Sequence, residues 1–145
     1  MEPTSRGFAP SPGYLTNHVS SLSVLNDRSM AAINLVPLDV ISKCRALGAP
    51  TFITPLSEFG ERAVYTIIEY HPLLDSSNMG PVEWTRIAND IRDLYKDWDA
   101  FLILHGTDTM SFTASVLAFW FSNLRYTRTT YIHTHNIYIY IYVNI

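Results

Sequence analysis

The 145-residue sequence has very little of several features that mark particular classes of protein. Cys44 is the only cysteine, so no internal disulfide can form, and a reducing compartment such as the cytoplasm is expected. Leaving tyrosine aside, the longest uninterrupted apolar run is Val116 to Phe121, which is far shorter than the roughly 20 residues that a spanning helix needs. The beginning of the chain contains three prolines and no apolar signal segment. We therefore expect no membrane attachment and no signal peptide.

Charged residues and glycine clusters are also scarce. Charged residues make up 16% of the chain and the net charge is -3, so no basic face for nucleic acid is predicted. The six glycines never form the phosphate-binding patterns GxGxxG or GxxxxGKS, and no GxSxG elbow of a serine hydrolase is present. His133 and His135 are spaced as same-side residues of a strand, but they have no carboxylate or cysteine nearby, so a metal site is not expected.

What is present divides the chain into three regions. Residues 1 to about 62 are weakly patterned, with one short helix predicted at Val40 to Leu47 and stopped by Gly48. The clearest pattern runs from Ala63 to Leu124. Residues 125–145 alternate isoleucine with tyrosine, threonine or histidine and hold five of the nine tyrosines. We predict a domain over residues 1–124 and a low-complexity tail over 125–145 outside its core; the alternative for the tail is an added strand for self-association.

The middle region is typical of a strand-helix-strand-helix order. The predicted strands are Ala63–Tyr70, which is rich in β-branched and aromatic residues, and Ala100–Leu104, a continuous apolar run. Pro81 suits the first turn of a helix in which Glu83 occupies the capping-box position. That helix carries one apolar stripe, formed by Trp84, Ile87, Ala88, Ile91, Leu94 and Tyr95. The second helix is predicted over Thr109–Leu124.

Alternating strands and helices predict an open α/β fold with a parallel sheet and right-handed crossovers. Both predicted strands then end at the same edge, so the loops Asp75–Asn78 and His105–Thr109 should lie side by side. Ligands bind at this edge in open α/β folds, and each loop precedes a helix amino terminus, where free N–H groups favour an anion. The pattern predicts a pocket of hydroxyls and amides beside one carboxylate.

Simpler interpretations exist for the same residues. Thr107, Asp108 and Thr109 are types preferred as helix caps, and spacing alone favours that interpretation. Ser76 and Ser77 are equally typical of a turn. His105, at the end of a strand, is more typical of a buried imidazole with satisfied hydrogen bonds than of a catalyst.

The hexapeptide HGTDTM begins at His105 and is followed by an apolar stretch that ends in Ser-Asn-Leu; together they closely resemble the second signature of the asparaginase/glutaminase family. The similarity extends backward to the DSSNM segment thirty residues upstream. The likeness is strongest to cytosolic type I L-asparaginases. It covers about 62 residues, Ala63 to Leu124, and extends more faintly to GFAPSPGYL at Gly7 to Leu15, which is similar to the family's lid segment. The resemblance implies the three-layer α/β/α amino-terminal domain of that family.

The resemblance also implies a reaction and roles for particular residues. A threonine hydroxyl attacks the side-chain amide of L-asparagine and releases ammonia, and water then releases L-aspartate, without a metal or cofactor. Asp75, Ser76 and Ser77 would belong to the substrate loop, with Ser76 on the α-carboxylate. Asp108 would bind the α-ammonium, and Thr107 would face the reacting amide, which makes these two the catalytic candidates. Members of the family form homo-oligomers.

The sequence departs from the family in several places. It contains no TGGT loop, which carries the primary nucleophile, and its only lysines, Lys43 and Lys96, both precede the HGTDTM signature. Phe8 stands where the lid has an activating tyrosine. We therefore expect an amino-terminal fragment that is inactive alone. The alternative is a non-catalytic isoform that associates with, or interferes with, full-length subunits. A lysophospholipase activity, associated with larger animal relatives, has no support in these residues.

Overall fold

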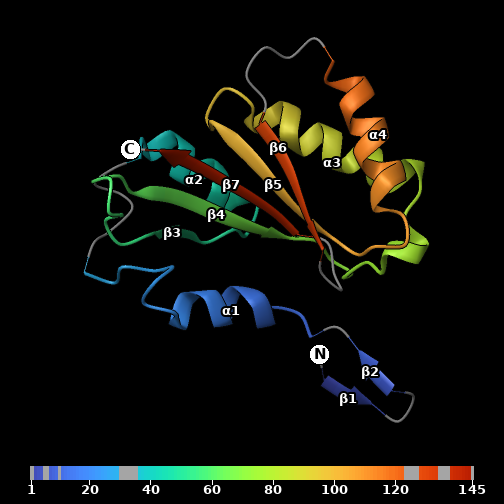
Figure 1. Ribbon diagram of the computed structural model, residues 1–145, viewed down its shortest axis with the longest axis horizontal. Helices are drawn as coiled ribbons and strands as arrows, with labels where there is room; N and C mark the ends of the chain where they lie inside the picture. The colour runs from blue at the N-terminus through green and yellow to red at the C-terminus, as the bar shows by residue number, and fades with distance from the viewer. Residues whose placement is uncertain are drawn as a thin grey trace. The chain divides into compact units, whose positions relative to one another are not determined.

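The computed structural model describes residues 2–4, 7–9, 11–29, 36–122, 128–133 and 138–144, and it describes side chains for 11–29 and 36–122. The chain divides into two compact units, Met1–Glu69 with Tyr142–Ile145, and Tyr70–Ile141. Figure 1 shows the elements of each unit. Within the described ranges, no helix has the length and apolar character needed to cross a membrane.

The first unit contains two antiparallel strand pairs and two helices. Its elements are β1 (Glu2–Thr4), β2 (Gly7–Ala9), α1 (Tyr14–Ser21), α2 (Leu38–Ala46), β3 (Thr51–Ile53) and β4 (Ala63–Glu69). Strand β1 pairs with β2, and β3 pairs with β4 with Phe52 opposite Tyr65. Strand β4 coincides with the first predicted strand to within one residue. The antiparallel partner β3 was not predicted, because a strand of three residues is too short to show an alternation.

Local chemistry explains several boundaries in this unit. Helix α2 confirms the predicted short helix, and the chain leaves it at Gly48 with a φ of 69°, a left-handed conformation that favours glycine. Gly13, with a φ of 74°, precedes α1 and donates its N–H to the Glu69 carboxylate at 2.7 Å. The end of β4 therefore anchors the start of a helix more than fifty residues earlier in the chain.

The second unit contains η2 (Ser76–Asn78), α3 (Pro81–Leu94), β5 (Ala100–His105), α4 (Met110–Trp120) and β6 (Arg128–His133); β7 (Tyr138–Asn144) continues into the first unit. Strands β5 and β6 are parallel, with Ala100 opposite Arg128 and His105 opposite His133. The predicted α/β class is confirmed. The parallel relation between Ala63–Tyr70 and Ala100–Leu104 stays a prediction.

Helix α3 forms as its sequence pattern predicts. Pro81 is its first residue, and the Glu83 carboxylate accepts a hydrogen bond from the Gly80 N–H at 2.9 Å. The stripe residues Ile87 and Ile91 are fully buried, and Leu94 is nearly so. Helix α3 packs beside α4 (Figure 1). Strand β5 is buried along almost its whole length, as expected for a continuous apolar run.

Helix α4 differs from the prediction in its exposure. It runs from Met110 to Trp120, and the predicted end at Leu124 lies outside the described residues. Thr113 and Leu117 are its buried residues, whereas Phe112 and Phe119 are 63% and 79% exposed. The sequence is apolar around most of the helix, and a helix packed on one side covers only one face of it. An exposed apolar row therefore remains on α4.

The tail contributes backbone to a sheet. Strand β6 pairs with β5 over six residues, so the tail forms regular structure despite its change of composition. His133 belongs to β6, whereas His135, the other member of the histidine pair, lies outside the described residues. That residues 125–145 contribute nothing to the core stays a prediction.

Candidate functional site

The first loop of the candidate site is built around the carboxylate of Asp75. This carboxylate accepts hydrogen bonds from the Ser77 backbone N–H at 3.0 Å and from the Ser77 hydroxyl at 2.9 Å. These two bonds favour the ionised form and hold the pKa of Asp75 below its ordinary value. The loop is thereby wound into the short helix η2, with Asp75 and Ser77 exposed and Ser76 buried at 4% exposure.

A direct hydrogen bond joins this loop to the second one. The Thr109 hydroxyl donates to the Ser76 carbonyl at 2.6 Å, across 33 positions of sequence. The predicted juxtaposition of the loops Asp75–Asn78 and His105–Thr109 is therefore confirmed. Thr109 occupies the cap position of α4, but its side chain makes no capping hydrogen bond. The interpretation of this threonine as a simple helix cap is wrong, because its hydroxyl ties two loops together instead.

The buried part of the second loop is held by a chain of hydrogen bonds centred on His105, whose side chain is fully buried. One ring nitrogen, Nδ1, lies 2.6 Å from the Gly106 carbonyl oxygen, and the other, Nε2, lies 2.9 Å from the Thr113 hydroxyl. The indole N–H of Trp84 donates to the same hydroxyl at 2.9 Å. These hydrogen bonds thus connect α3, α4 and the end of β5.

The direction of each hydrogen bond in this chain follows from the chemistry of its ends. An indole N–H can only donate and a carbonyl can only accept. His105 therefore carries a proton on Nδ1, and Thr113 accepts from Trp84 and donates to Nε2. Burial lowers the pKa of His105, and the bond to Gly106 offsets part of that effect. The imidazole is neutral and both its nitrogens are engaged, which confirms the interpretation of His105 as a satisfied buried side chain and leaves it unavailable as a general base.

The next two residues have the opposite character. Thr107 and Asp108 are exposed. Among the residues whose side chains are described, none forms a hydrogen bond or ion pair with the Thr107 hydroxyl or the Asp108 carboxylate. A negative charge and a hydroxyl are therefore presented to solvent from a backbone whose preceding residues are buried and fixed.

The segment that leads into Asp75 is anchored on α3. The Tyr70 hydroxyl donates to the Asp90 carboxylate at 2.6 Å, and the Arg86 guanidinium lies 4.1 Å from the centre of the Tyr70 ring. Burial raises the pKa of both Tyr70 and Asp90. Since Tyr70 is 1% exposed, these contacts fix the segment that leads into Asp75 rather than offer a reactive group.

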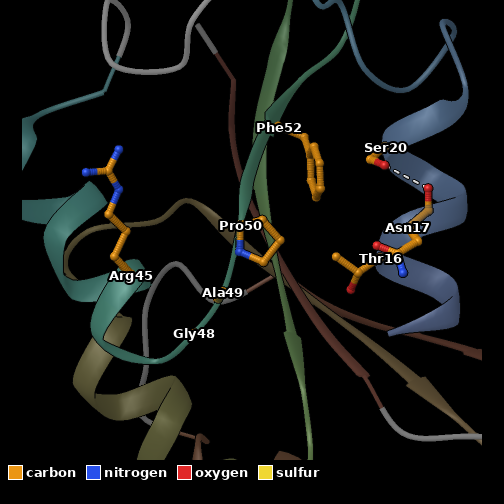
Figure 2. Close-up of a pocket in the computed structure, with 8 residues that line it drawn as sticks. All are labelled: Thr16, Asn17, Ser20, Arg45, Gly48, Ala49, Pro50 and Phe52. Atoms are coloured by element: carbon orange, nitrogen blue, oxygen red, sulfur yellow. Dashed lines mark hydrogen bonds between the residues drawn. The ribbon is translucent and has the colours of Figure 1, made fainter. Parts of the chain in front are cut away.

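A separate cavity in the first unit, of about 550 Å³, contains none of the predicted site residues (Figure 2). It is lined by Thr16, Asn17, Ser20, Arg45, Gly48, Ala49, Pro50 and Phe52. Figure 2 shows the Arg45 guanidinium on the opposite side of the chain from Thr16 and Asn17, so the charge does not converge with the polar groups of α1. Over the part of the chain with described side chains, no cluster of histidine, cysteine and acidic residues could hold a metal ion.

The sequence did not predict the hydrogen bonds of Thr113 to His105 and Trp84, and it assigned Trp84 only to an apolar stripe. One feature of the sequence could have indicated that Thr113 has a buried partner. Thr113 lies one turn before Leu117 on the buried face of an otherwise apolar helix, and a hydroxyl in such a place needs a hydrogen-bonding partner. The identity of that partner required the three-dimensional arrangement.

Comparison with known proteins places the sequence of this chain in a family. The family model described as "Asparaginase, N-terminal" matches residues 16–127. An L-asparaginase of Dirofilaria immitis is 36% identical over 118 residues, covering 81% of this chain and 19% of that protein. L-asparaginase 1 of Escherichia coli strain K12 is 58% identical over 60 residues, covering 41% of this chain and 18% of that protein.

A third relative is named for a different activity. The 60 kDa lysophospholipase of Homo sapiens is 40% identical over 86 residues, covering 59% of this chain and 15% of that protein. The chain thus spans about a fifth or less of the length of these relatives. The family model nevertheless covers most of the chain, including both loops of the candidate site, and the chain belongs to the asparaginase family through its amino-terminal domain.

Proposed function

We propose that the loops Asp75–Asn78 and His105–Thr109 form the amino-acid-binding part of an L-asparaginase-type site, with L-asparagine as the ligand and the cytoplasm as its location. The observation that carries this proposal is the 2.6 Å hydrogen bond between Thr109 and Ser76, which brings the two loops together beside the Asp108 carboxylate, for which the described side chains offer no partner. Neither nucleic acid nor a membrane is proposed as a partner.

Each end of the ligand has a suitable group in this site. The Asp108 carboxylate is exposed and suits the α-ammonium through a charge-assisted hydrogen bond. The hydroxyls and amides of Ser76 and Ser77 suit the α-carboxylate, and Asp75 fixes the loop that carries them. Ser76 fits the binding of the α-carboxylate least well, because only 4% of its surface is exposed and a ligand can contact only that small part.

Thr107 is the proposed nucleophile for the side-chain amide. Its oxygen would form a bond to the amide carbon, ammonia would leave with a proton, and water would then release L-aspartate and restore the hydroxyl. A threonine hydroxyl needs a base for the first step. Both nitrogens of His105 are engaged, and among the described side chains no other base contacts Thr107. We therefore propose that the 145 residues alone bind L-asparagine without turning it over, as the loss of activating groups typically costs on the order of 10³-fold in rate.

Two measurements on the purified 145-residue chain test the proposal. Titration with L-asparagine, followed by NMR shifts of the Thr107 and Asp108 amides, should show saturable binding that weakens in Asp108→Asn. Ammonia release should not exceed that of Thr107→Ala. An absence of saturable shifts would contradict the binding site, and ammonia release abolished by Thr107→Ala would contradict the lack of turnover.

The exposed row on α4 favours a second candidate, a non-catalytic isoform that associates with longer asparaginase subunits. Phe112 and Phe119 are 63% and 79% exposed, and Trp120 is 47% exposed. Exposed apolar side chains grouped on one element can mark a protein–protein interaction site. Size-exclusion chromatography of the chain mixed with a full-length asparaginase distinguishes this candidate. Co-elution that is lost in Phe119→Glu would support it, and independent elution would exclude it.

A further inference from the structure

We infer that Thr113 is a positioning residue that holds the His105 ring in place and, through it, sets the orientation of the Thr107–Asp108 segment. The role assigned to that segment rests on the proposed function, but the positioning itself rests on three hydrogen bonds among residues from α3, β5 and α4. Thr113 is the central residue of this series of hydrogen bonds, and both Thr113 and His105 are fully buried.

The Thr113 hydroxyl satisfies two buried groups at once. The Gly106 carbonyl can only accept, so the neutral His105 ring carries its hydrogen on Nδ1 and presents Nε2 as an acceptor. The Thr113 oxygen accepts from Trp84 with a lone pair, and its own proton goes to His105 Nε2. A valine at position 113 has nearly the same shape and would leave both the indole N–H and Nε2 without a partner.

The position of the His105 ring affects the exposed residues through the planar peptide between Gly106 and Thr107. His105 Nδ1–H holds the Gly106 carbonyl at 2.6 Å. In a planar trans peptide the carbonyl and the following N–H point in opposite directions, so the Thr107 N–H is turned away from the buried ring. The direction in which Thr107 and Asp108 leave the core is thus set by a hydroxyl on the buried face of α4.

The test uses the full 145-residue chain labelled with ¹⁵N, and three variants. Long-range ¹H–¹⁵N correlation of the imidazole reports the tautomer, and amide spectra report the Thr107–Asp108 backbone. Thr113→Ser keeps the hydroxyl, Thr113→Val removes it, and Thr85→Val is the matched control, because the Thr85 hydroxyl bonds only within α3, to the Pro81 carbonyl. L-asparagine titration of each protein supplies a second readout.

The wild-type ring should be the neutral Nδ1–H tautomer at pH 7, and Thr113→Ser and Thr85→Val should preserve it. Thr113→Val should keep the Nδ1–H tautomer, because the Gly106 carbonyl still requires it, but it should shift the ¹⁵N signal of Nε2, which loses the proton donated to it. The Thr107 and Asp108 amides should shift as well, and L-asparagine affinity should fall by about fivefold, the factor expected for one lost hydrogen bond to the ring. An Nε2–H or charged ring in the wild type, or unchanged Nε2, Thr107 and Asp108 signals in Thr113→Val, would overturn the inference. If the wild type shows the expected tautomer but binds no L-asparagine, the proposed function fails and the positioning role stands.

Discussion

Two halves of one short loop differ completely in their surroundings. His105 and Gly106 are buried, and every polar atom of the imidazole has a partner. Thr107 and Asp108, one and two positions further on, are exposed and have no side-chain partner among the described residues. A loop that served only to begin a helix would use its polar side chains on its own backbone. The contrast is between a buried anchor and exposed polar side chains, an arrangement that fits the proposed binding site.

The largest effect should come from removing the anchor. His105→Leu leaves the Gly106 carbonyl and the proton of the Thr113 hydroxyl without a partner in the core, and each buried unsatisfied group costs about 1–3 kcal/mol, so we expect a loss of about 2–5 kcal/mol in the free energy of unfolding. Thr107→Val, on the exposed half, should change it by no more than about 0.5 kcal/mol. Urea unfolding of both variants measures the difference. Equal losses would remove the distinction between the halves.

A smaller effect should follow from cutting the connection between the loops. Thr109→Val removes the hydrogen bond to the Ser76 carbonyl and should cost about 1 kcal/mol in the free energy of unfolding. The amide signals of Ser77 and Asn78 should shift with it, because the loop loses its tether. Thr109→Ser should restore both. Unchanged Ser77 and Asn78 signals in Thr109→Val would mean that the loops hold their positions independently.

The pH dependence of stability should reveal the neutral imidazole. The folded pKa of His105 lies below the value of about 6.5 expected in the unfolded chain, so below pH 6.5 the unfolded state binds more protons than the folded state. The contribution of His105 is therefore complete above pH 6.5 and is lost progressively as the pH falls toward the folded pKa. Unfolding midpoints at pH 7.5 and 5.5 should differ more in the wild type than in His105→Gln. An equal difference would mean that burial does not lower the pKa of His105, and a smaller difference in the wild type would mean that the ring is charged in the fold.

The smallest effect on stability should come from deleting the tail, residues 125–145. Deletion of residues 125–145 should leave the thermal unfolding midpoint unchanged or raised, because the composition change at Arg125 argues that this segment was not selected to pack on the domain. Strand β6 nevertheless pairs with β5. A fall of more than about 3 °C, which corresponds to roughly 1 kcal/mol for a chain of this size, would show that this pairing stabilises the domain.

The strongest periodic patterns in the sequence predicted the corresponding elements well. The apolar stripe with Pro81 and Glu83 gave α3 its boundaries, and the apolar run gave β5, because periodicity and capping act locally. The meeting of the two loops also followed from the order of elements. Helix α1 and strand β3 were missed, since α1 has only one buried residue and β3 is too short for a pattern.

The inner arrangement of the site was less accessible to sequence reasoning. Sequence spacing favoured a cap for Thr109, whereas the hydroxyl bonds a carbonyl 33 positions away. Thr113 and Trp84 meet His105 only because three separate elements converge. The exposure of Phe119 was equally hidden, because hydrophobicity around a whole helix does not indicate which face packs. Patterns within one element are therefore visible in a sequence, whereas partners across elements are not.

The most direct test of the account compares L-asparagine with succinamic acid, which has the same amide and carboxylate but no α-ammonium. If Asp108 binds the α-ammonium, the chain should prefer L-asparagine by roughly 10-fold to 100-fold, as expected for a hydrogen bond between charged groups. Asp108→Asn should abolish that preference by weakening L-asparagine alone, while Asp75→Asn, which leaves Asp108 intact, should preserve it. Equal affinities for the two ligands in the wild type, or an undiminished preference in Asp108→Asn, would contradict the central claim that this loop presents Asp108 to an amino acid.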